Sequence, residues 1–111
     1  KYKGKKLPLP KIKREDIAGQ PDPYQKLREH NFEVDHDSVV HLDDPSEEQL
    51  QRLWEHYLAN VSMIDEKVGE IMDSLERNGY LDNTVILFTS DHGEALGEHG
   101  HIQKQASVLK L

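Results

Sequence analysis

Cysteine is absent from the 111 residues, so the chain holds neither a disulfide framework nor a cysteine-based metal site. Long apolar runs are also missing, because no stretch approaches the roughly 18 apolar residues that a membrane span requires. Basic charge is scarce relative to acidic charge: the net charge is −7 and the pI is near 5.4. Proteins that bind nucleic acids usually carry a basic face. We therefore expect neither a membrane nor a nucleic acid among the partners.

Hydrophobic periodicity is lacking over residues 1–44, which four prolines interrupt. We expect a mostly irregular segment that lies on another surface, because compact domains seldom contain so long a structureless stretch. The sequence does not begin with Met and stops abruptly at ASVLKL. We therefore expect the chain to be part of something longer, divided at residue 44 into this segment and a more regular part over 45–111.

A long amphipathic helix is predicted to follow. Asp44 before Pro45, with Glu47 three residues after Asp44, is a start signal for a helix. Apolar residues then recur at steps of three and four as far as Leu75, and Gly79 supplies a stop. The pattern predicts a helix of about 33 residues, roughly 50 Å long. A bend near Asn60–Ser62 that would divide it into two helices is left open.

The run TVILFT, after the turn YLDN, predicts a strand that is covered on both faces, since it is apolar throughout. A helix, a tight turn and a buried strand form the second half of an α/β unit, so the predicted fold class is α/β. Ligands of such folds gather beyond the carboxyl ends of the strands. The polar stretch that follows, TSDHGEALGEHGHIQK, lies at that position.

Asp91 and His92 come directly after the predicted strand, and a turn eased by Gly93 would bring both side chains to one metal ion. Carboxylate oxygen suits Ca²⁺ or Mg²⁺, whereas imidazole favours Zn²⁺, Mn²⁺ or iron, so the pair alone does not choose the metal. On spacing alone, the tetrapeptide Ser-Asp-His-Gly is more typical of a capped turn.

Three further residues of the stretch have side chains that are suited to binding a metal, a proton or an anion. His99 and His101 are open to roles as ligand, general acid or plain surface histidine. Lys104 is the cation near the cluster, and in a pocket its ammonium would attract a tetrahedral oxyanion as a compact point charge.

Residues 55–104 closely resemble the late part of the catalytic domain of sulfatases, within the alkaline phosphatase superfamily. The resemblance joins the helix pattern, the strand, Ser-Asp-His-Gly, Leu-Gly-Glu-His-Gly and a lysine shortly after. It implies an α/β/α sandwich, of which this chain would form a helix, a strand and a loop. Residues 1–44 fit only loosely, as the variable stretch before that helix.

The resemblance also implies roles for particular residues. Asp91 and His92 match the late pair of ligands to a divalent cation, usually Ca²⁺, with Zn²⁺ or Mn²⁺ as less common alternatives. Many sulfatases have Asn where this chain has His92, and the branch similar to iduronate sulfatases has His. Lys104 matches the lysine that binds the substrate sulfate. His99 falls in a Gly-x-His element near the substrate pocket.

The sulfatase nucleophile is missing from this sequence. It is a formylglycine made from Cys or Ser in a Cys/Ser-x-Pro-x-Arg motif, which nothing here matches, and the early pair of metal-binding aspartates is absent as well. We therefore expect a fragment that is inactive alone and that, in the whole enzyme, serves hydrolysis of sulfate esters, including those of sulfated sugars. The family implies a periplasmic, secreted or lysosomal-type setting, although this sequence itself does not identify the compartment.

Two alternatives remain open. Phosphonate monoester hydrolases and phosphodiesterases of the same superfamily share the Asp-His-Gly turn, and Lys104 favours a sulfatase over them. A non-catalytic module whose long helix binds a partner belongs to another class. In either case a helix stripe and a strand that are built for burial predict self-association of the isolated chain.

Overall fold

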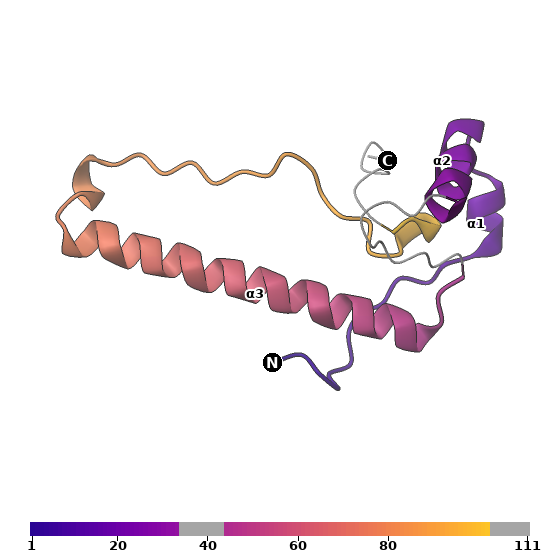
Figure 1. Ribbon diagram of the computed structural model, residues 1–111, viewed down its shortest axis with the longest axis horizontal. Coiled ribbons are helices and arrows are strands. Elements are labelled where there is room, and N and C mark those ends of the chain that lie inside the picture. The colour runs from indigo at the N-terminus through magenta and orange to yellow at the C-terminus, as the bar shows by residue number, and fades with distance from the viewer. Residues whose placement is uncertain (34–43, 103–111) are drawn as a thin grey trace.

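The computed structural model describes residues 1–33 and 44–102, with the backbone alone for 30–33. Within these residues the secondary structure is helical (Figure 1). The elements are the α-helices α1 (Arg14–Ala18), α2 (Asp22–Glu33) and α3 (Glu47–Arg77), and the 3-10 helices η1 (Leu81–Asn83) and η2 (Glu98–Gly100).

The predicted long amphipathic helix is confirmed as α3, although its first residues differ from the prediction. Ser46, not Asp44, is the N-cap: its side chain accepts a hydrogen bond from the Gln49 amide nitrogen at 3.2 Å. The Gln49 side chain in turn accepts from the Ser46 amide nitrogen at 2.9 Å, which completes a capping box. Asp44 instead forms an exposed ion pair with Arg14 at 3.2 Å. The Ser46 hydroxyl, two residues after Asp44, thus accepts the amide hydrogen bond that we expected the Asp44 carboxylate to accept.

Helix α3 ends where the sequence predicts. Gly79 adopts a left-handed conformation with φ of +69°, and its amide nitrogen donates to the Glu76 carbonyl at 3.0 Å. The Tyr80 amide nitrogen donates to the Leu75 carbonyl at 2.9 Å, so the terminus is a Schellman motif. The helix is continuous from Glu47 to Arg77, and the alternative of two helices is therefore wrong.

The predicted buried strand is not present in the described part of the chain. Residues 84–90 carry no strand assignment, and in Figure 1 they run back in the direction opposite to α3. Val85 is 96% exposed and Phe88 is 80% exposed. A strand is held by hydrogen bonds to neighbouring strands and by elements that cover its faces. No partner strand lies within residues 1–33 and 44–102, so the apolar segment stays unpaired and in solvent.

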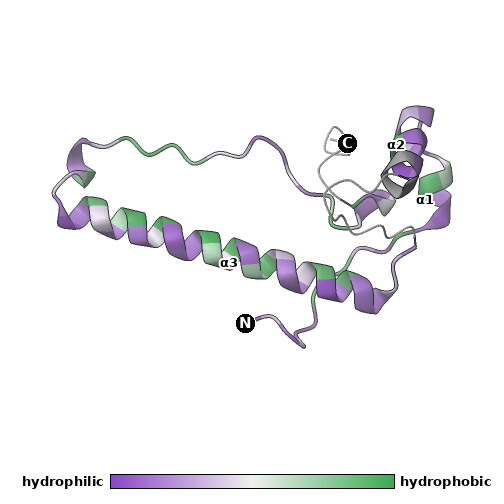
Figure 2. Cartoon of the chain, in the orientation of Figure 1, coloured by the Kyte–Doolittle hydropathy of each residue, from purple (hydrophilic) through white to green (hydrophobic). Residues whose placement is uncertain are grey.

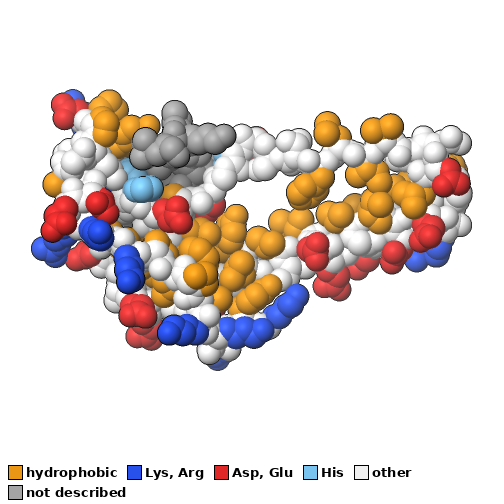
Figure 3. All heavy atoms as spheres, turned by 180° about the vertical axis from the view of Figure 1, so that it is seen from behind, with side chains coloured by type: hydrophobic (Ala, Val, Ile, Leu, Met, Phe, Trp, Pro, Cys, Tyr) orange, Lys and Arg blue, Asp and Glu red, His pale blue; other side chains and the backbone are white. Residues whose placement is uncertain are grey.

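Much of the apolar surface of the molecule is open. Figure 2 shows hydrophobic residues recurring along α3 and along the extended segment, and Figure 3 shows apolar side chains on both sides of the open space between them. The accessible surface is 9081 Å², against about 6,300 Å² for a folded monomer of this mass. The radius of gyration is 18.1 Å, against about 13 Å for a compact domain.

Burial is concentrated at one end of the molecule, where α1, α2, η2 and the first turns of α3 meet (Figure 1). Leu50 of α3 is 5% exposed and His101 is 3% exposed. Helices α1 and α2 lie within residues 1–44, where we expected mostly irregular chain, and α1 packs against η2. The early part of the sequence thus builds the surface on which the loop after Asp91 and His92 rests.

The N-terminal residues lie along the outer face of α3. The Tyr2 hydroxyl hydrogen-bonds the Ser62 hydroxyl at 2.7 Å, and the Gly4 amide nitrogen donates to a Glu55 carboxylate oxygen at 3.0 Å. Gln51 donates from its side chain to the Lys5 carbonyl at 2.7 Å. None of the helices in the described ranges combines the length and apolar character needed to cross a membrane.

Candidate active-site turn and its supporting loop

Asp91 and His92 converge in a tight turn just after the extended segment. One carboxylate oxygen of Asp91 accepts from the His92 amide nitrogen at 2.9 Å, and the other lies 3.4 Å from His92 Nε2. His92 Nδ1 lies 2.9 Å from the Gly93 carbonyl oxygen. Because a carbonyl only accepts, Nδ1 carries a proton and donates, and Nε2 is the ring nitrogen that lies near the Asp91 carboxylate.

This arrangement fits a divalent cation. An imidazole nitrogen and a carboxylate oxygen approach one another either as an ion pair, with a proton between them, or as two ligands with a cation between them. Two donor atoms 3.4 Å apart have the spacing of neighbouring ligands to one ion when each bond is about 2.0–2.4 Å. That range includes both Zn²⁺ and Ca²⁺, so the distance does not choose between the metals. The Asp91 side chain is 85% exposed and open to further ligands.

Other protein ligands do not join this pair within the part of the chain that the structure describes. No group of three or more histidine, aspartate, glutamate or cysteine side chains is close enough there to hold a metal ion. Two ligands make a weak site, since affinity for hard cations rises with the number and charge of the ligands. Among the described residues, the pair thus offers two ligands and no third.

The loop after this turn has an unusual backbone. Four of its residues have positive φ: Leu96 at 51°, Gly97 at 95°, His99 at 54° and Gly100 at 74°. The Gly97 amide nitrogen donates to the His101 carbonyl at 2.9 Å, which closes the loop on itself. Left-handed conformations are uncommon for residues other than glycine and persist where surrounding contacts fix them.

Two glycines allow the loop to approach its neighbours closely. A Cβ atom on Gly97 would lie 2.8 Å from Cδ2 of Leu50 and 3.2 Å from Pro10. A Cβ atom on Gly100 would lie 2.8 Å from Cδ1 of Ile17. Both positions thus require glycine for the backbone conformation and for the space.

Side chains from the first half of the chain hold the loop by its carbonyl oxygens. The Gln20 side chain donates to the His99 carbonyl at 2.7 Å, and Arg28 Nε donates to the Gly100 carbonyl at 3.2 Å. Trp54 Nε1 donates to the Leu96 carbonyl at 2.9 Å. Donors from α2, α3 and the turn before α2 therefore hold three separate positions of one loop.

His101 is the buried polar residue of this region. Its Nε2 lies 2.9 Å from the Gln20 side-chain oxygen, and its ring packs edge-on against Tyr24 with 6.1 Å between ring centres. Since the Gln20 nitrogen is committed to His99, its oxygen accepts, and His101 Nε2 carries the proton. Burial lowers the pKa of His101, and the neighbouring charges of Arg28 and His99 lower it further.

The structure describes three of the four predicted site residues. Asp91 and His92 lie together, as a shared metal site requires. His99 is exposed on η2 and contributes its backbone carbonyl to the contact with Gln20. Lys104 lies outside the described residues. Sequence reasoning left His101 open and missed Gln20 and Arg28; the spacing of Gly97 and Gly100 was the one local signal of a closely packed loop.

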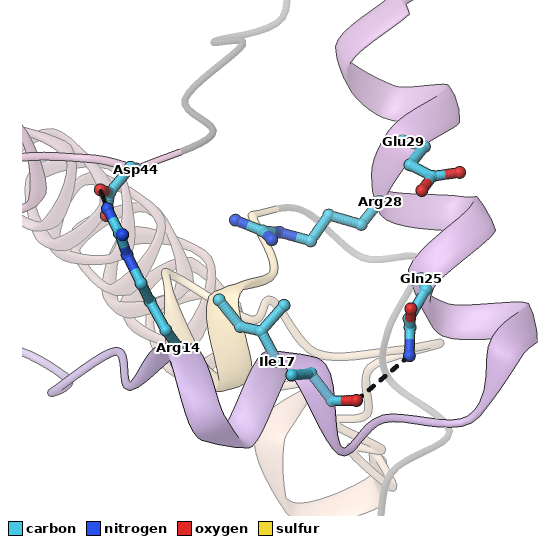
Figure 4. Close-up of a pocket in the computed structure, with 7 residues that line it drawn as sticks. Arg14, Ile17, Gln25, Arg28, Glu29 and Asp44 are labelled. Atoms are coloured by element: carbon cyan, nitrogen blue, oxygen red, sulfur yellow. Dashed lines mark hydrogen bonds and ion pairs between the residues drawn. The ribbon is translucent and has the colours of Figure 1, made fainter.

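An open pocket of about 410 Å³ lies beside this loop, between α1, α2 and Asp44 (Figure 4). Figure 4 shows Arg28 extending from α2 past Ile17, while Gln25 bonds back to the Ala18 carbonyl. The pocket lining contains two arginines and two carboxylates, Glu29 and Asp44, so its formal charges balance. The pocket therefore has no net charge that would favour an anion or a cation.

The chain belongs to the sulfatase family, in the alkaline phosphatase superfamily. The family model described as "Sulfatase" matches residues 14–109, which include α1, α2, the Asp91–His92 turn and the loop that follows. No solved structure matches the chain.

Curated relatives match between half and nearly nine-tenths of the chain. A choline-sulfatase of Rhizobium meliloti is 54% identical over 51% of this chain and 11% of its own length. An N-acetylglucosamine-6-O-sulfatase of Bacteroides thetaiotaomicron is 47% identical over 51% of this chain and 10% of its own length. A multifunctional alkaline phosphatase superfamily protein of Trinickia caryophylli is 28% identical over 88% of this chain and 20% of its own length. The chain thus spans about a tenth to a fifth of the length of these relatives.

Proposed function

We propose that this chain is the late part of a sulfatase catalytic domain that hydrolyses sulfate esters. In this proposal Asp91 and His92 hold a divalent cation, most commonly Ca²⁺ in this family, and Lys104 binds the sulfate group. The formylglycine nucleophile comes from outside the chain. The observation that carries the proposal is the 3.4 Å approach of Asp91 to His92 Nε2, within a region that matches the sulfatase family.

Each residue has a physical task in this proposal. The Asp91 carboxylate supplies negative charge to the cation, and the Gly93 carbonyl keeps the His92 ring in the tautomer that presents Nε2. When bound, the cation stabilises negative charge on substrate oxygens and helps to activate the nucleophile. The Lys104 ammonium offsets the charge on the sulfate oxygens as the ester bond breaks.

A sulfated sugar is among the substrates that the proposal includes. The relative from Bacteroides thetaiotaomicron acts on an N-acetylglucosamine 6-O-sulfate, and the one from Rhizobium meliloti acts on choline sulfate. The two relatives are similarly identical to this chain although their substrates differ. We infer that residues mostly outside this segment select the substrate, and that the segment serves the sulfate group that these substrates share.

The direct test compares turnover of 4-nitrophenyl sulfate by the full-length protein and by three variants of it. Asp91→Ala and Lys104→Ala should each lower kcat/KM by at least about a hundredfold, the loss typical of removing one charge-stabilising group. Asp73→Ala, which removes an exposed carboxylate of α3, is the matched control and should leave turnover unchanged. Near-normal turnover in the Asp91 or Lys104 variant would remove that residue from the site.

Metal binding by the isolated chain gives a second test. With two protein ligands, we expect Ca²⁺ to bind with a Kd no better than about 1 mM, because ligand number sets affinity. Isothermal titration calorimetry measures this, and Asp91→Asn should abolish the remaining signal. Micromolar binding would show that the chain carries a complete site and would overturn the division proposed here.

A phosphonate monoester hydrolase or phosphodiesterase of the same superfamily is the second candidate. Its support is the relative described as a multifunctional protein of this superfamily, which is 28% identical over 88% of this chain and whose description does not restrict it to sulfate esters. The ratio of kcat/KM for 4-nitrophenyl sulfate to that for a 4-nitrophenyl phosphonate ester separates the two functions. A ratio well above one supports the sulfatase, and a ratio well below one supports the second candidate.

A further inference from the structure

The positive charges of the chain are concentrated at its start. Residues 1–14, which we call the basic segment, contain seven of the 14 lysines and arginines and none of the 21 aspartates and glutamates. The basic segment therefore has a formal charge of +7, and the other residues, with seven cations and all 21 carboxylates, have −14. The cations of the basic segment are Lys1, Lys3, Lys5, Lys6, Lys11 and Lys13, with Arg14.

The six lysines of the basic segment are exposed and have no acidic partner. Arg14 pairs with Asp44, but no ion pair joins any of these lysines to a carboxylate in the described parts of the chain. The ammonium groups of Lys1 and Lys5 each lie 5.8 Å from the centre of the Tyr2 ring. Since the chain has 21 acidic residues for 14 basic ones, the lysines stay unpaired although carboxylates are plentiful. They form a surface of uncompensated positive charge.

The backbone of the basic segment is held in place. Side chains of α3 form hydrogen bonds with the Gly4 amide nitrogen and the Lys5 carbonyl. Between the exposed lysines, Leu7, Leu9 and Ile12 are partly buried. Figure 3 shows lysine and arginine side chains along the lower edge of the molecule. The lysines are therefore presented to solvent by an anchored backbone.

This distribution of charge fits a polymer better than a small anion. The six lysines are spread over 13 residues of chain, so a single small anion reaches few of them. A polyanion contacts many lysines at once and releases the counterions condensed on it, which drives binding. It also removes the repulsion between like charges that the anchored backbone holds near one another.

We propose that the basic segment is a docking surface for a sulfated polysaccharide. The choice of this class among the polyanions rests on the proposed function, whose substrates carry sulfate esters and include sulfated sugars. In Figure 1 the first residues of the segment lie on the side of α3 away from the extended chain that leads to Asp91 and His92. Docking there leaves the Asp91–His92 turn free and keeps the sulfate groups of the polymer at a high local concentration.

The experiment measures the Kd of the full-length protein for dextran sulfate, with uncharged dextran as the blank. Glu48 and Glu55 line an open pocket of about 640 Å³ together with Lys1 and Lys3, so the substitutions are placed outside it. The docking variant combines Lys5→Gln, Lys6→Gln and Lys11→Gln. It should raise the Kd at least about tenfold near 0.1 M salt and make the Kd less dependent on salt. An unchanged Kd would overturn the proposal.

The matched control changes the net charge equally but elsewhere. It removes three exposed cations of α2 and α3: Lys26→Gln, Lys67→Gln and Arg77→Gln. It should change the Kd for dextran sulfate less than twofold. Equal losses in the control and in the docking variant would show that binding follows net charge alone, and would overturn the proposal.

Duplex DNA tests the class of partner. It should bind at least about tenfold more weakly than dextran sulfate, because a stiff duplex meets fewer of the lysines than a flexible sugar chain does. Equal or tighter binding of DNA would overturn the assignment to a sulfated polysaccharide.

Turnover of 4-nitrophenyl sulfate separates failure of this inference from failure of the proposed function. The docking variant should hydrolyse this small ester as fast as the unsubstituted protein, since the ester does not need the docking surface. A tenfold loss would indicate general damage to the fold and overturn the proposal. No turnover by the unsubstituted protein would refute the proposed function, whereas the Kd values, measured without turnover, decide whether the basic segment is a docking surface.

Discussion

Gly97 and Gly100 determine how closely the loop after Asp91 and His92 can lie against the rest of the molecule. At Gly97 the φ of +95° disfavours any L side chain, and an added Cβ would approach Leu50 to 2.8 Å. Leu50 is also the most buried apolar side chain among the described residues. A single methyl group at Gly97 would therefore disturb both the loop and the small core.

We expect Gly97→Ala to lower the free energy of unfolding by about 1–3 kcal/mol, from backbone strain and from the steric clash. Urea unfolding followed by fluorescence measures this well, because the single tryptophan, Trp54, hydrogen-bonds the neighbouring Leu96 carbonyl. Gly69→Ala is the control: it lies inside α3 with open space around it, and should raise stability by about 0.5–1 kcal/mol. A neutral Gly97→Ala would show that the loop does not pack here.

His101 should make stability depend on pH. Its pKa is lowered in the folded chain, mainly by burial and further by Arg28 and His99. Between that lowered value and the ordinary value of about 6.5, the unfolded chain binds more protons than the folded one. Stability therefore rises with pH through this window, and the contribution of His101 is lost as the pH falls through the folded pKa.

Urea unfolding at several pH values between 5 and 7.5 tests the sign. The difference in free energy of unfolding between the original chain and His101→Gln should grow as the pH rises. Asn60→Gln, exposed on α3, replaces one uncharged side chain by another, so it serves as the control and should give a constant difference. A difference that shrinks with rising pH would mean that the folded chain favours the charged form of His101.

At the scale of elements, the first turn of α3 depends on Ser46. The capping box satisfies amide groups that the helix itself leaves unpaired. Ser46→Ala should lower the free energy of unfolding by about 1 kcal/mol. Asp44→Ala removes the residue that the sequence pattern favoured as the cap, and should cost little, because its ion pair with Arg14 is exposed. Equal losses, measured by urea unfolding with circular dichroism, would contradict the cap assignment.

Helix α3 was predictable because its signals are local. The apolar spacing, the stop at Gly79 and the start signal all lie within the element, and only the choice between Asp44 and Ser46 went wrong. The segment 84–90 was not predictable in the same way. Its composition predicts a buried strand, but a strand depends on neighbouring strands for its pairing, and none is present in the described residues.

The residues of the candidate site also differ in whether local sequence predicts them. Asp91 and His92 are adjacent, so one turn suffices to bring them together, and the sequence indicated this. Gln20 and Arg28 act on residues more than 70 positions away, and nothing in their own neighbourhood marks them. Polar side chains that anchor a distant loop become visible only when the chain is folded.

At the scale of the whole molecule, the apolar surface is the dominant feature. Ile71 of α3 is 61% exposed, and Leu87 and Phe88 are more than three-quarters exposed. Apolar area of this extent marks an interaction surface in soluble proteins. In a whole sulfatase domain the remaining elements would cover it, and a separate partner would cover it in a non-catalytic module.

For the isolated chain we expect self-association, because burial of this face against a second copy releases water from apolar side chains. Size-exclusion chromatography with light scattering should give a mass above the 12.8 kDa of one chain. The double substitution Ile71→Ser and Phe88→Ser should shift the distribution towards monomer, since both are large apolar side chains that are exposed in the single chain. Asp73→Ser, elsewhere on the surface of α3, should leave it unchanged. A monomeric chain with cooperative unfolding would mean that the face needs no cover, and would contradict the interpretation of this chain as one part of a larger domain.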